Sequence, residues 1–430
     1  MLEKLFKLSE NKTNVRTELV AGLTTFLTMA YIIFVNPSIL AEAKMPFGAV
    51  FAATCVAAAI GCFLMAFLAN YPIALAPGMG LNAYFAFGVV GGMGLSWQVA
   101  LGCVFISGVL FLVISVTPIR EWIVNAIPRS LKMAIAAGIG LFLALIALKN
   151  AGIVVGNPAT LVAHGKMTSW PVMMAVLGFA IIVGLESRRI MGGVILGILV
   201  VTVISILAGH QKFAGILDVP PSIAPVFLQM DLAGALQVGL VTVVFAFLFV
   251  DLFDNTGTLI ALAHRGGFMR PDGTVPRLRG ALISDSAAAM IGAAVGTSTT
   301  TSYIESASGI NAGGRTGLTA AAVGVLFLLA LFLAPLAGSI PAYATAPALL
   351  YVACLMARSL TEIEWNDLTE AAPAVITAIS MPFTFSIADG IAFGFISYAG
   401  IKIAAGRYRD VHPAVGILAV LFVIKYVVIG

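Results

Sequence analysis

The chain has 430 residues, 60% of them hydrophobic and only 10% charged, and its formal net charge is +4. Ordinary soluble domains carry about 25% charged residues, so this composition excludes a soluble enzyme, a nucleic-acid-binding protein and a disordered scaffold. It also excludes a porin-like barrel, whose strands alternate apolar and polar residues. The mean hydropathy of +1.07 predicts a surface that faces lipid, and at about 20 residues per crossing the chain has room for roughly fourteen helices.

Apolar segments divide the chain into two halves of seven, separated by a polar stretch at 211–221. The segments of the first half lie near 18–42, 48–70, 78–93, 96–117, 130–149, 170–185 and 190–209. Those of the second half lie near 232–262, 279–296, 303–312, 315–337, 341–358, 368–383 and 387–405, and a last run, 413–429, is left over. The first segment is too long for a signal-peptide core and lacks a small-residue cleavage site, so we expect a retained first span.

Basic residues follow the positive-inside rule when the amino terminus is placed in the cytoplasm. If the segments alternate across the bilayer, nearly all Lys and Arg residues fall on the cytoplasmic side. The exceptions are Lys44, Lys149, Lys166 and Lys212 outside, and Lys425 in the unplaced last run. This asymmetry predicts an all-α polytopic membrane protein of about fourteen transmembrane segments, in the plasma membrane or, in a bacterium, the inner membrane.

An odd number of segments in each half makes the second half run inverted relative to the first. Inverted repeats place substrate sites near the midplane, where broken helices from both halves meet, so the third and tenth segments should be short and interrupted. The third opens with two prolines and two glycines within Tyr71–Asn82. The tenth, Gly296–Asn311, is mostly polar, and we expect its half-helix to begin at Ser302 or Tyr303. An ordinary hydrophilic loop is the alternative, but it would give the flanking segments the wrong parity.

Acidic side chains inside the spans are the first candidates for function, because a charge at the centre of a span costs roughly 2.5–3.5 kcal/mol on insertion scales. Asp251 and Asp254 are three residues apart and are expected on one helical face, whereas Glu305 lies in the broken tenth segment. Buried carboxylates that face one cavity can hold a proton and release it when the cavity opens to the cytoplasm. Asp285, in the ninth segment, is a further acid of this kind.

Ordinary structural explanations exist for most of these acids. Asp254 can belong to a helix-ending turn, and Glu305 can cap the half-helix. Asp285 can lie near the cytoplasmic end and pair with Arg277 or Arg279. Asp251 is the hardest of the four to explain without a function.

Polar side chains on the broken segments and the first span complete the candidate substrate site. Asn82 follows the break in the third segment, at the mirror position of Ser302 and Glu305. Its amide offers a donor and an acceptor to the edge of a flat heterocycle, but asparagine is also a favoured helix cap. Thr28 lies on a threonine-bearing side of the first span, where it can line the cavity or bond back to its own helix.

Enzyme motifs are missing from the sequence, which has no Walker phosphate loop and no HExxH zinc motif, and whose four histidines are scattered. The four cysteines lie within apolar runs without metal-like spacing and are interpreted as packing residues. We therefore expect neither an enzyme nor a bound metal or organic cofactor.

Four blocks of the sequence resemble the AzgA-like purine permeases of the nucleobase:cation symporter group. These blocks are Asn14–Pro37, Gly78–Phe85, Phe249–Asp254 and Glu305–Gly317. The resemblance implies a uracil-permease-like fold of fourteen spans in seven-plus-seven inverted repeats. It implies a core domain made of 1–117 and 230–337. It also implies a gate domain made of 118–210 and 338–430, the latter including the extra C-terminal hydrophobic segment.

The resemblance also implies a function: import of adenine, guanine or hypoxanthine by alternating access, with a proton as the coupling ion. By motif position, Asp251 and Glu305 bind the purine and Asn82 assists. Proton coupling falls to Asp254 together with these two acids. Ser302 and Thr28 are added to the substrate site from their positions in the sequence.

The expected partners are a purine base and the lipid bilayer, without nucleic acid, and by analogy a homodimer through the gate domain. An aromatic ring such as Phe26 or Tyr303 is expected to stack on the base. The alternative function is an anion transporter of the sulfate or bicarbonate type on the same fold, whose site would favour half-helix N-termini and a cation. A membrane-embedded enzyme would require a nucleophile or a metal cluster, and the sequence offers neither.

Overall fold

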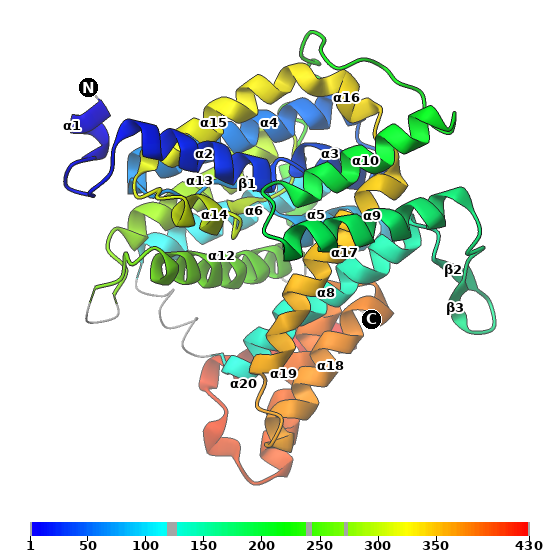
Figure 1. Ribbon diagram of the computed structural model, residues 1–430. Coiled ribbons are helices and arrows are strands. Elements are labelled where there is room, and N and C mark those ends of the chain that lie inside the picture. The colour runs from blue at the N-terminus through cyan, green and yellow to red at the C-terminus, as the bar shows by residue number, and fades with distance from the viewer. Residues whose placement is uncertain (1, 118–126, 238–242, 271–273, 429–430) are drawn as a thin grey trace. The chain divides into compact units, whose positions relative to one another are not determined.

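The computed structural model (Figure 1) describes residues 2–117, 127–237, 243–270 and 274–428, and it is mainly helical. Ten helices in these ranges are long and apolar enough to cross a membrane, and three shorter apolar helices accompany them. Each of the fifteen predicted apolar runs contains a helix, although part of the run at 232–262 lies outside the described residues. The protein is therefore a helical polytopic membrane protein, whereas the count of fourteen spans stays a prediction.

The chain forms two compact units. The first unit comprises Met1–Val116 and Asn150–Ala348, and the second comprises Thr117–Lys149 and Leu349–Gly430. The predicted gate domain instead included residues 118–210. The division into a core and a gate concerns movement rather than compactness, and it stays a prediction.

The first unit contains both broken segments. Its first part consists of α1 (Leu2–Phe6), α2 (Val15–Met29), α3 (Ile32–Glu42), α4 (Phe47–Leu64), the π-helix η1 (Met65–Ala69), β1 (Leu75–Pro77), α5 (Met79–Ala83), the π-helix η2 (Tyr84–Gly92) and α6 (Trp97–Val116). Its second part consists of β2 (Val154–Asn157), β3 (Leu161–His164), α9 (Trp170–Ser187), α10 (Gly193–Leu207), α11 (Leu232–Gln237), α12 (Phe245–Arg265), α13 (Leu278–Val295), β4 (Thr300–Ser302), α14 (Ser306–Asn311), α15 (Gly317–Ala330), η4 (Leu331–Leu333) and α16 (Ala334–Gly338).

Several of the helices begin at a short polar side chain that accepts a hydrogen bond from the first turn, as expected of N-caps. Asn14 caps α2 in this way, Thr316 caps α15, and the second unit contains two further examples. The helix α13 ends at Gly296, whose φ of 102° lies in the left-handed region, where glycine carries no Cβ penalty. Local sequence thus sets several of the boundaries around the broken segments.

A buried carboxylate fastens α2 to the start of α15, two helices that lie side by side in Figure 1. The Thr316 and Thr319 hydroxyls each donate to Glu18 Oε2, at 2.8 and 2.7 Å respectively. The backbone N–H of Arg315 donates to Glu18 Oε1 at 2.9 Å. A negative charge is stabilised at a helix N-terminus by the unpaired N–H groups and the helix dipole. Glu18 therefore fixes the position of the first span against α15.

The two broken segments meet as a short antiparallel ladder. In this ladder Leu75 faces Ser302, and Pro77 faces Thr300. β1 is followed by the short helix α5, and β4 by the short helix α14. The prediction that the third and tenth segments are interrupted is confirmed. The expected start of the tenth half-helix was wrong, because Ser302 pairs within β4 and α14 begins four residues later, at Ser306.

The second unit is built from α8 (Arg129–Asn150), η5 (Arg358–Glu362), α18 (Leu368–Thr384), α19 (Ile387–Ala404), η6 (Tyr408–Asp410) and α20 (Pro413–Val428), and α17 (Ala342–Ala357) runs into it from the first unit. The left-over apolar run of the sequence forms α20, which packs on α19. Lys425 Nζ lies 3.1 Å from Asp389 Oδ1, and the Tyr426 hydroxyl donates to the same oxygen at 2.6 Å. The extra helix is thus tied to its neighbour by polar contacts as well as by packing.

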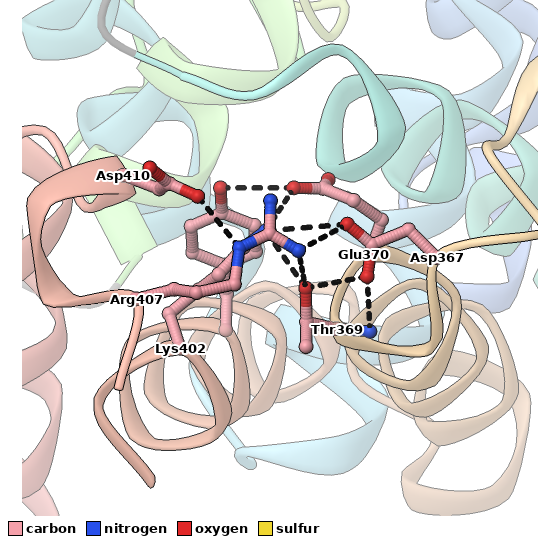
Figure 2. Close-up of polar contacts among 7 residues, drawn as sticks. Asp367, Thr369, Glu370, Lys402, Arg407 and Asp410 are labelled. Atoms are coloured by element: carbon pink, nitrogen blue, oxygen red, sulfur yellow. Dashed lines mark hydrogen bonds and ion pairs between the residues drawn. The ribbon is translucent and has the colours of Figure 1, made fainter. Parts of the chain in front are cut away.

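Figure 2 shows an ionic cluster where α18 begins and α19 ends. Lys402 is buried, with its Nζ 2.7 Å from Glu370 Oε1 and donating to Thr369 Oγ1 at 2.8 Å. Arg407 reaches Asp367 Oδ2 at 2.6 Å. Hydrogen bonds from Thr369 and Arg407 hold the pKa of Asp367 well below its usual range. The cluster therefore holds the segment between α19 and α20 against the start of α18.

Candidate functional site

A buried polar cluster joins α12, α13 and β4. Asn255 lies at its centre, and its amide nitrogen donates to Asp251 Oδ1 at 2.7 Å and to Asp285 Oδ2. The side-chain amide oxygen of Asn255 accepts hydrogen bonds from Thr301 Oγ1 at 2.8 Å and from the Ser302 backbone N–H at 3.0 Å. All five side chains are buried. We call these five residues the Asn255 cluster.

Two carboxylates of the Asn255 cluster differ in how well they are satisfied. Asp285 Oδ1 accepts from Ser302 Oγ at 2.9 Å and its Oδ2 accepts from Asn255, so both oxygens have a partner. Asp251 Oδ2 is buried and has no hydrogen-bond partner among the described residues. Because an unpaired polar atom costs about 1–3 kcal/mol when buried, this oxygen is expected to take a proton or a donor from a ligand. It is the acceptor that the cluster leaves open.

Glu305 lies at the junction of β4 and α14, immediately before the first residue of the helix. The Tyr31 hydroxyl, in the short break between α2 and α3, donates to Glu305 Oε1 at 2.6 Å. The Glu305 side chain makes no capping hydrogen bond to α14, so the alternative of a half-helix cap is not observed. Tyr31 fixes one oxygen of a half-buried carboxylate beside the broken segment.

The remaining acids depart from the alternatives left open by the sequence. Asp254 does not end a helix, because α12 continues to Arg265. Asp254 is exposed, whereas Asp251 is buried. The alternative of a snorkelling pair for Asp285 is not observed, because its oxygens accept hydrogen bonds from Asn255 and Ser302. A role of Asp254 in coupling stays a prediction.

Asn82 is fully buried in a second polar network. Its amide nitrogen donates to Asn36 Oδ1 at 2.6 Å, and its carbonyl accepts from the Ser298 hydroxyl. The side chain does not cap α5, which begins at Met79 without a side-chain hydrogen bond. Both polar atoms that were expected to face a heterocycle already have partners within the protein.

Thr28 and the two candidate aromatic residues also have local partners. The Thr28 hydroxyl donates to the carbonyl of Thr25, one turn earlier in α2, at 2.8 Å. Phe26 packs edge-on against Phe327, with the ring centroids 5.2 Å apart. The Tyr303 hydroxyl donates to the Pro77 carbonyl at 2.6 Å, across the paired strands. Direct contact of these residues with a substrate stays a prediction.

Sequence reasoning missed three amide or hydroxyl residues that organise the site. Asn255 follows Asp251 by one helical turn and Asn36 lies in the mainly apolar second half of the first span, so each could have been flagged as a polar residue at membrane depth. Tyr31 carried no such signal, because a tyrosine in a span is unremarkable without its partner. Glu305 lies 274 positions away in the chain, and only the fold brings the two together.

The architecture defines the class of the protein. Interrupted segments that cross within a bundle of membrane helices, with buried carboxylates beside them, are the arrangement of secondary transporters. The chain matches the family model Xan_ur_permease, described as the Permease family, over residues 16–393. It belongs to this family and is a multi-pass membrane permease rather than an enzyme.

Individual relatives agree with this assignment. The chain is 51% identical to the adenine permease AdeP of Escherichia coli (strain K12), covering 100% of this chain and 96% of that protein. It is 46% identical to the guanine/hypoxanthine permease PbuG of Bacillus subtilis (strain 168), covering 99% of each. The transmembrane domain of the cyanobacterial bicarbonate transporter BicA superposes with a TM-score of 0.65, covering 90% of this chain and 98% of that domain. At 17% identity this last likeness shows the fold alone.

Proposed function

We propose that this permease imports a purine nucleobase together with a proton, and that Asp251 and Glu305 are the carboxylates that bind the base. The observation that carries the proposal is the open acceptor at Asp251 Oδ2, in a cluster whose other members are satisfied. A purine edge presents N–H donors that a carboxylate oxygen can accept. Relatives named as adenine and guanine/hypoxanthine permeases support the choice of purines.

The charge of the site argues against the anion alternative. The Asn255 cluster contains two carboxylates, and Glu305 lies three residues beyond Ser302. An anion would be repelled by these groups, whereas a neutral base with N–H donors is attracted to them. The likeness to a bicarbonate transporter concerns the fold, because it is carried by a chain that is only 17% identical.

Proton coupling follows from the same oxygen. A carboxylate at membrane depth is expensive, and a proton on the Asp251 carboxyl removes its charge while the site loaded with the base reorients, so that base and proton enter together; the proton leaves with the base, and the empty site returns without it. Asn255 donates to the other oxygen of Asp251, and both Asn255 and Asp285 are hydrogen-bonded to β4. These contacts hold the Asp251 side chain in one place whether or not it carries a proton. Asp254, exposed on α12, is the further acid assigned to coupling.

The orientation and assembly expected from the sequence belong to the same proposal. The amino terminus is cytoplasmic, the permease lies in the plasma membrane or bacterial inner membrane, and the core moves against a gate that pairs two copies. Labelling of single cysteines placed at exposed Lys4 or Lys166 with an impermeant reagent tests the orientation. Reaction of intact cells at position 4 but not at position 166 would contradict it.

The function is tested by radiolabelled uptake into proteoliposomes with a competition panel of adenine, guanine, hypoxanthine, xanthine and uracil. We expect purines to compete and uracil not to, and uptake to collapse when the pH gradient is dissipated. Asp251→Asn should abolish uptake. The matched control is Glu42→Gln, because Glu42 is an exposed acid at the last residue of α3. An uptake rate that is the same with and without the pH gradient would refute proton coupling. Wild-type uptake kinetics in Asp251→Asn would show that Asp251 does not bind the base.

A further inference from the structure

A buried asparagine in the first half connects the two broken segments. Asn36, on α3, has no exposed surface. Its amide nitrogen donates to Thr54 Oγ1 on α4 at 2.7 Å and to Thr297 Oγ1, shortly before β4, at 2.9 Å. Its amide oxygen accepts from Asn82 Nδ2 on α5 at 2.6 Å. One side chain therefore contacts three separate parts of the first unit.

The network continues from Asn82 back to the tenth segment, because the Ser298 hydroxyl donates to the Asn82 amide oxygen. Asn36 and Asn82 together thus reach both Thr297 and Ser298. We call Asn36, Thr54, Asn82, Thr297 and Ser298 the Asn36 network. All five are buried, and each of their side-chain polar atoms already has a hydrogen-bond partner within the protein.

The position of the Asn36 network lets it control the strand that builds the substrate site. Thr297 and Ser298 lie just before β4, separated from it by Thr299, and the last two residues of β4, Thr301 and Ser302, bond to Asn255. Asn82 lies in α5, which directly follows the partner strand β1. The network therefore fixes the chain at the N-terminal end of β4 and the C-terminal end of β1, while the Asn255 cluster fixes the C-terminal end of β4.

A shift of β4 by one residue would turn each side chain to the other face of the strand and would move the Thr301 hydroxyl and the Ser302 N–H away from Asn255. The ladder between β1 and β4 has only three facing pairs, which is little to specify the register. A fully satisfied buried polar network specifies one arrangement, because any other leaves its donors and acceptors unpaired. The Asn36 network therefore helps to fix the register of β4 against β1.

We propose that Asn36 and Asn82 are positioning residues for substrate: they act through β4 on Thr301 and Ser302 rather than by contacting the base. The inference deepens the proposed function and rests on it only for the identity of the substrate. It assigns to Asn82 a role different from the ligand contact that the resemblance implies.

The test combines uptake kinetics with a double-mutant cycle of Asn36→Ala, Asn82→Ala and the double variant. We expect each single change to raise the KM for adenine and for hypoxanthine by the same factor, about tenfold, without altering their ratio. The double variant should be no worse than either single one, because the two residues belong to one network. Thr297→Val, which removes one hydroxyl and keeps the side-chain shape, should raise both KM values in the same direction and serves if the alanine variants fail to fold.

Three outcomes would overturn the inference. A changed adenine-to-hypoxanthine ratio in Asn82→Ala but not in Asn36→Ala would show that Asn82 contacts the base. A lowered melting temperature with unchanged KM in all variants would show a purely structural role. Additive losses in the double variant would show that the two residues act independently.

Failure of the proposed function is distinguishable from failure of this inference. A wild-type protein that takes up no purine would refute the function alone. The cycle can then be read from melting temperatures in detergent without substrate. A non-additive loss between Asn36→Ala and Asn82→Ala would support the network, and additive losses would refute it.

Discussion

The change Asn255→Asp replaces one NH₂ group by an oxygen and tests the centre of the site at constant volume. The amide nitrogen that is lost donates to Asp251 and to Asp285, whereas the retained oxygen still accepts from Thr301 and Ser302. Hydrogen bonds to charged groups contribute about 1.5–3 kcal/mol each, so the two donor bonds together represent about 3–6 kcal/mol. A domain is stable by only about 5–15 kcal/mol.

Charge adds to this loss. The introduced carboxyl lies within hydrogen-bond distance of Asp251 Oδ1, and like charges about 4 Å apart repel by roughly 4 kcal/mol at the effective dielectric constant of a protein. We expect Asn255→Asp to lower the melting temperature and to abolish purine uptake at pH 8. A proton on the introduced carboxyl restores one donor, so the deficit relative to wild type should shrink at pH 5.5.

The assay is radiolabelled adenine uptake and thermal melting of the wild type and the variant at both pH values. The matched control is Asn157→Asp, because Asn157 Oδ1 only accepts, from the backbone N–H groups of Ala159 and Thr160. An aspartate there keeps both bonds, so its behaviour should equal that of wild type. Wild-type uptake and melting in Asn255→Asp at pH 8 would refute the idea that Asn255 holds the two carboxylates together.

Three further predictions concern other polar contacts. Lys402→Met removes the buried cation beside Glu370 and should destabilise the protein by about 3–5 kcal/mol; thermal melting checks this, and the double change with Glu370→Met should recover part of the loss. Because the pKa of Asp367 is depressed in the folded state, its stabilisation is present above the usual aspartate pKa and is lost as the pH falls through the folded value. Melting temperature should therefore drop less between pH 6 and pH 3 in Asp367→Asn than in wild type, and an equal drop would contradict this. Tyr31→Phe removes the hydroxyl that donates to Glu305 and should raise the KM for adenine several-fold; an unchanged KM would show that Glu305 needs no such partner.

The interrupted segments could be predicted from sequence because their cause is local. Proline and glycine before Asn82, and a polar run between two apolar ones at 296–311, cannot continue a membrane helix. The start of α14 could not be predicted, since the pairing of Ser302 with Leu75 depends on a strand more than two hundred residues away. Backbone pairing between the halves therefore overrode the local signal.

The site could be predicted only in part, for a similar reason. A lone carboxylate at membrane depth is visible in sequence because of its cost, and Asp251 was found in this way. The satisfaction of each carboxylate is not visible: Asp285 is engaged at both oxygens and Asp251 at one. From the sequence, the Asn82 amide was as good a candidate ligand for a heterocycle as Asp251. Only the structure shows that it is bonded to Asn36 and Ser298 within the protein interior.

The central claim, that Asp251 links purine entry to proton entry, is tested most directly by proton movement itself. Wild-type and Asp251→Asn proteoliposomes carrying a pH-sensitive dye in the lumen receive adenine outside, without any imposed gradient. The account predicts acidification of the lumen by the wild type and none by the variant. Adenine uptake by the wild type without acidification, or acidification by the Asp251→Asn variant equal to that of the wild type, would contradict it.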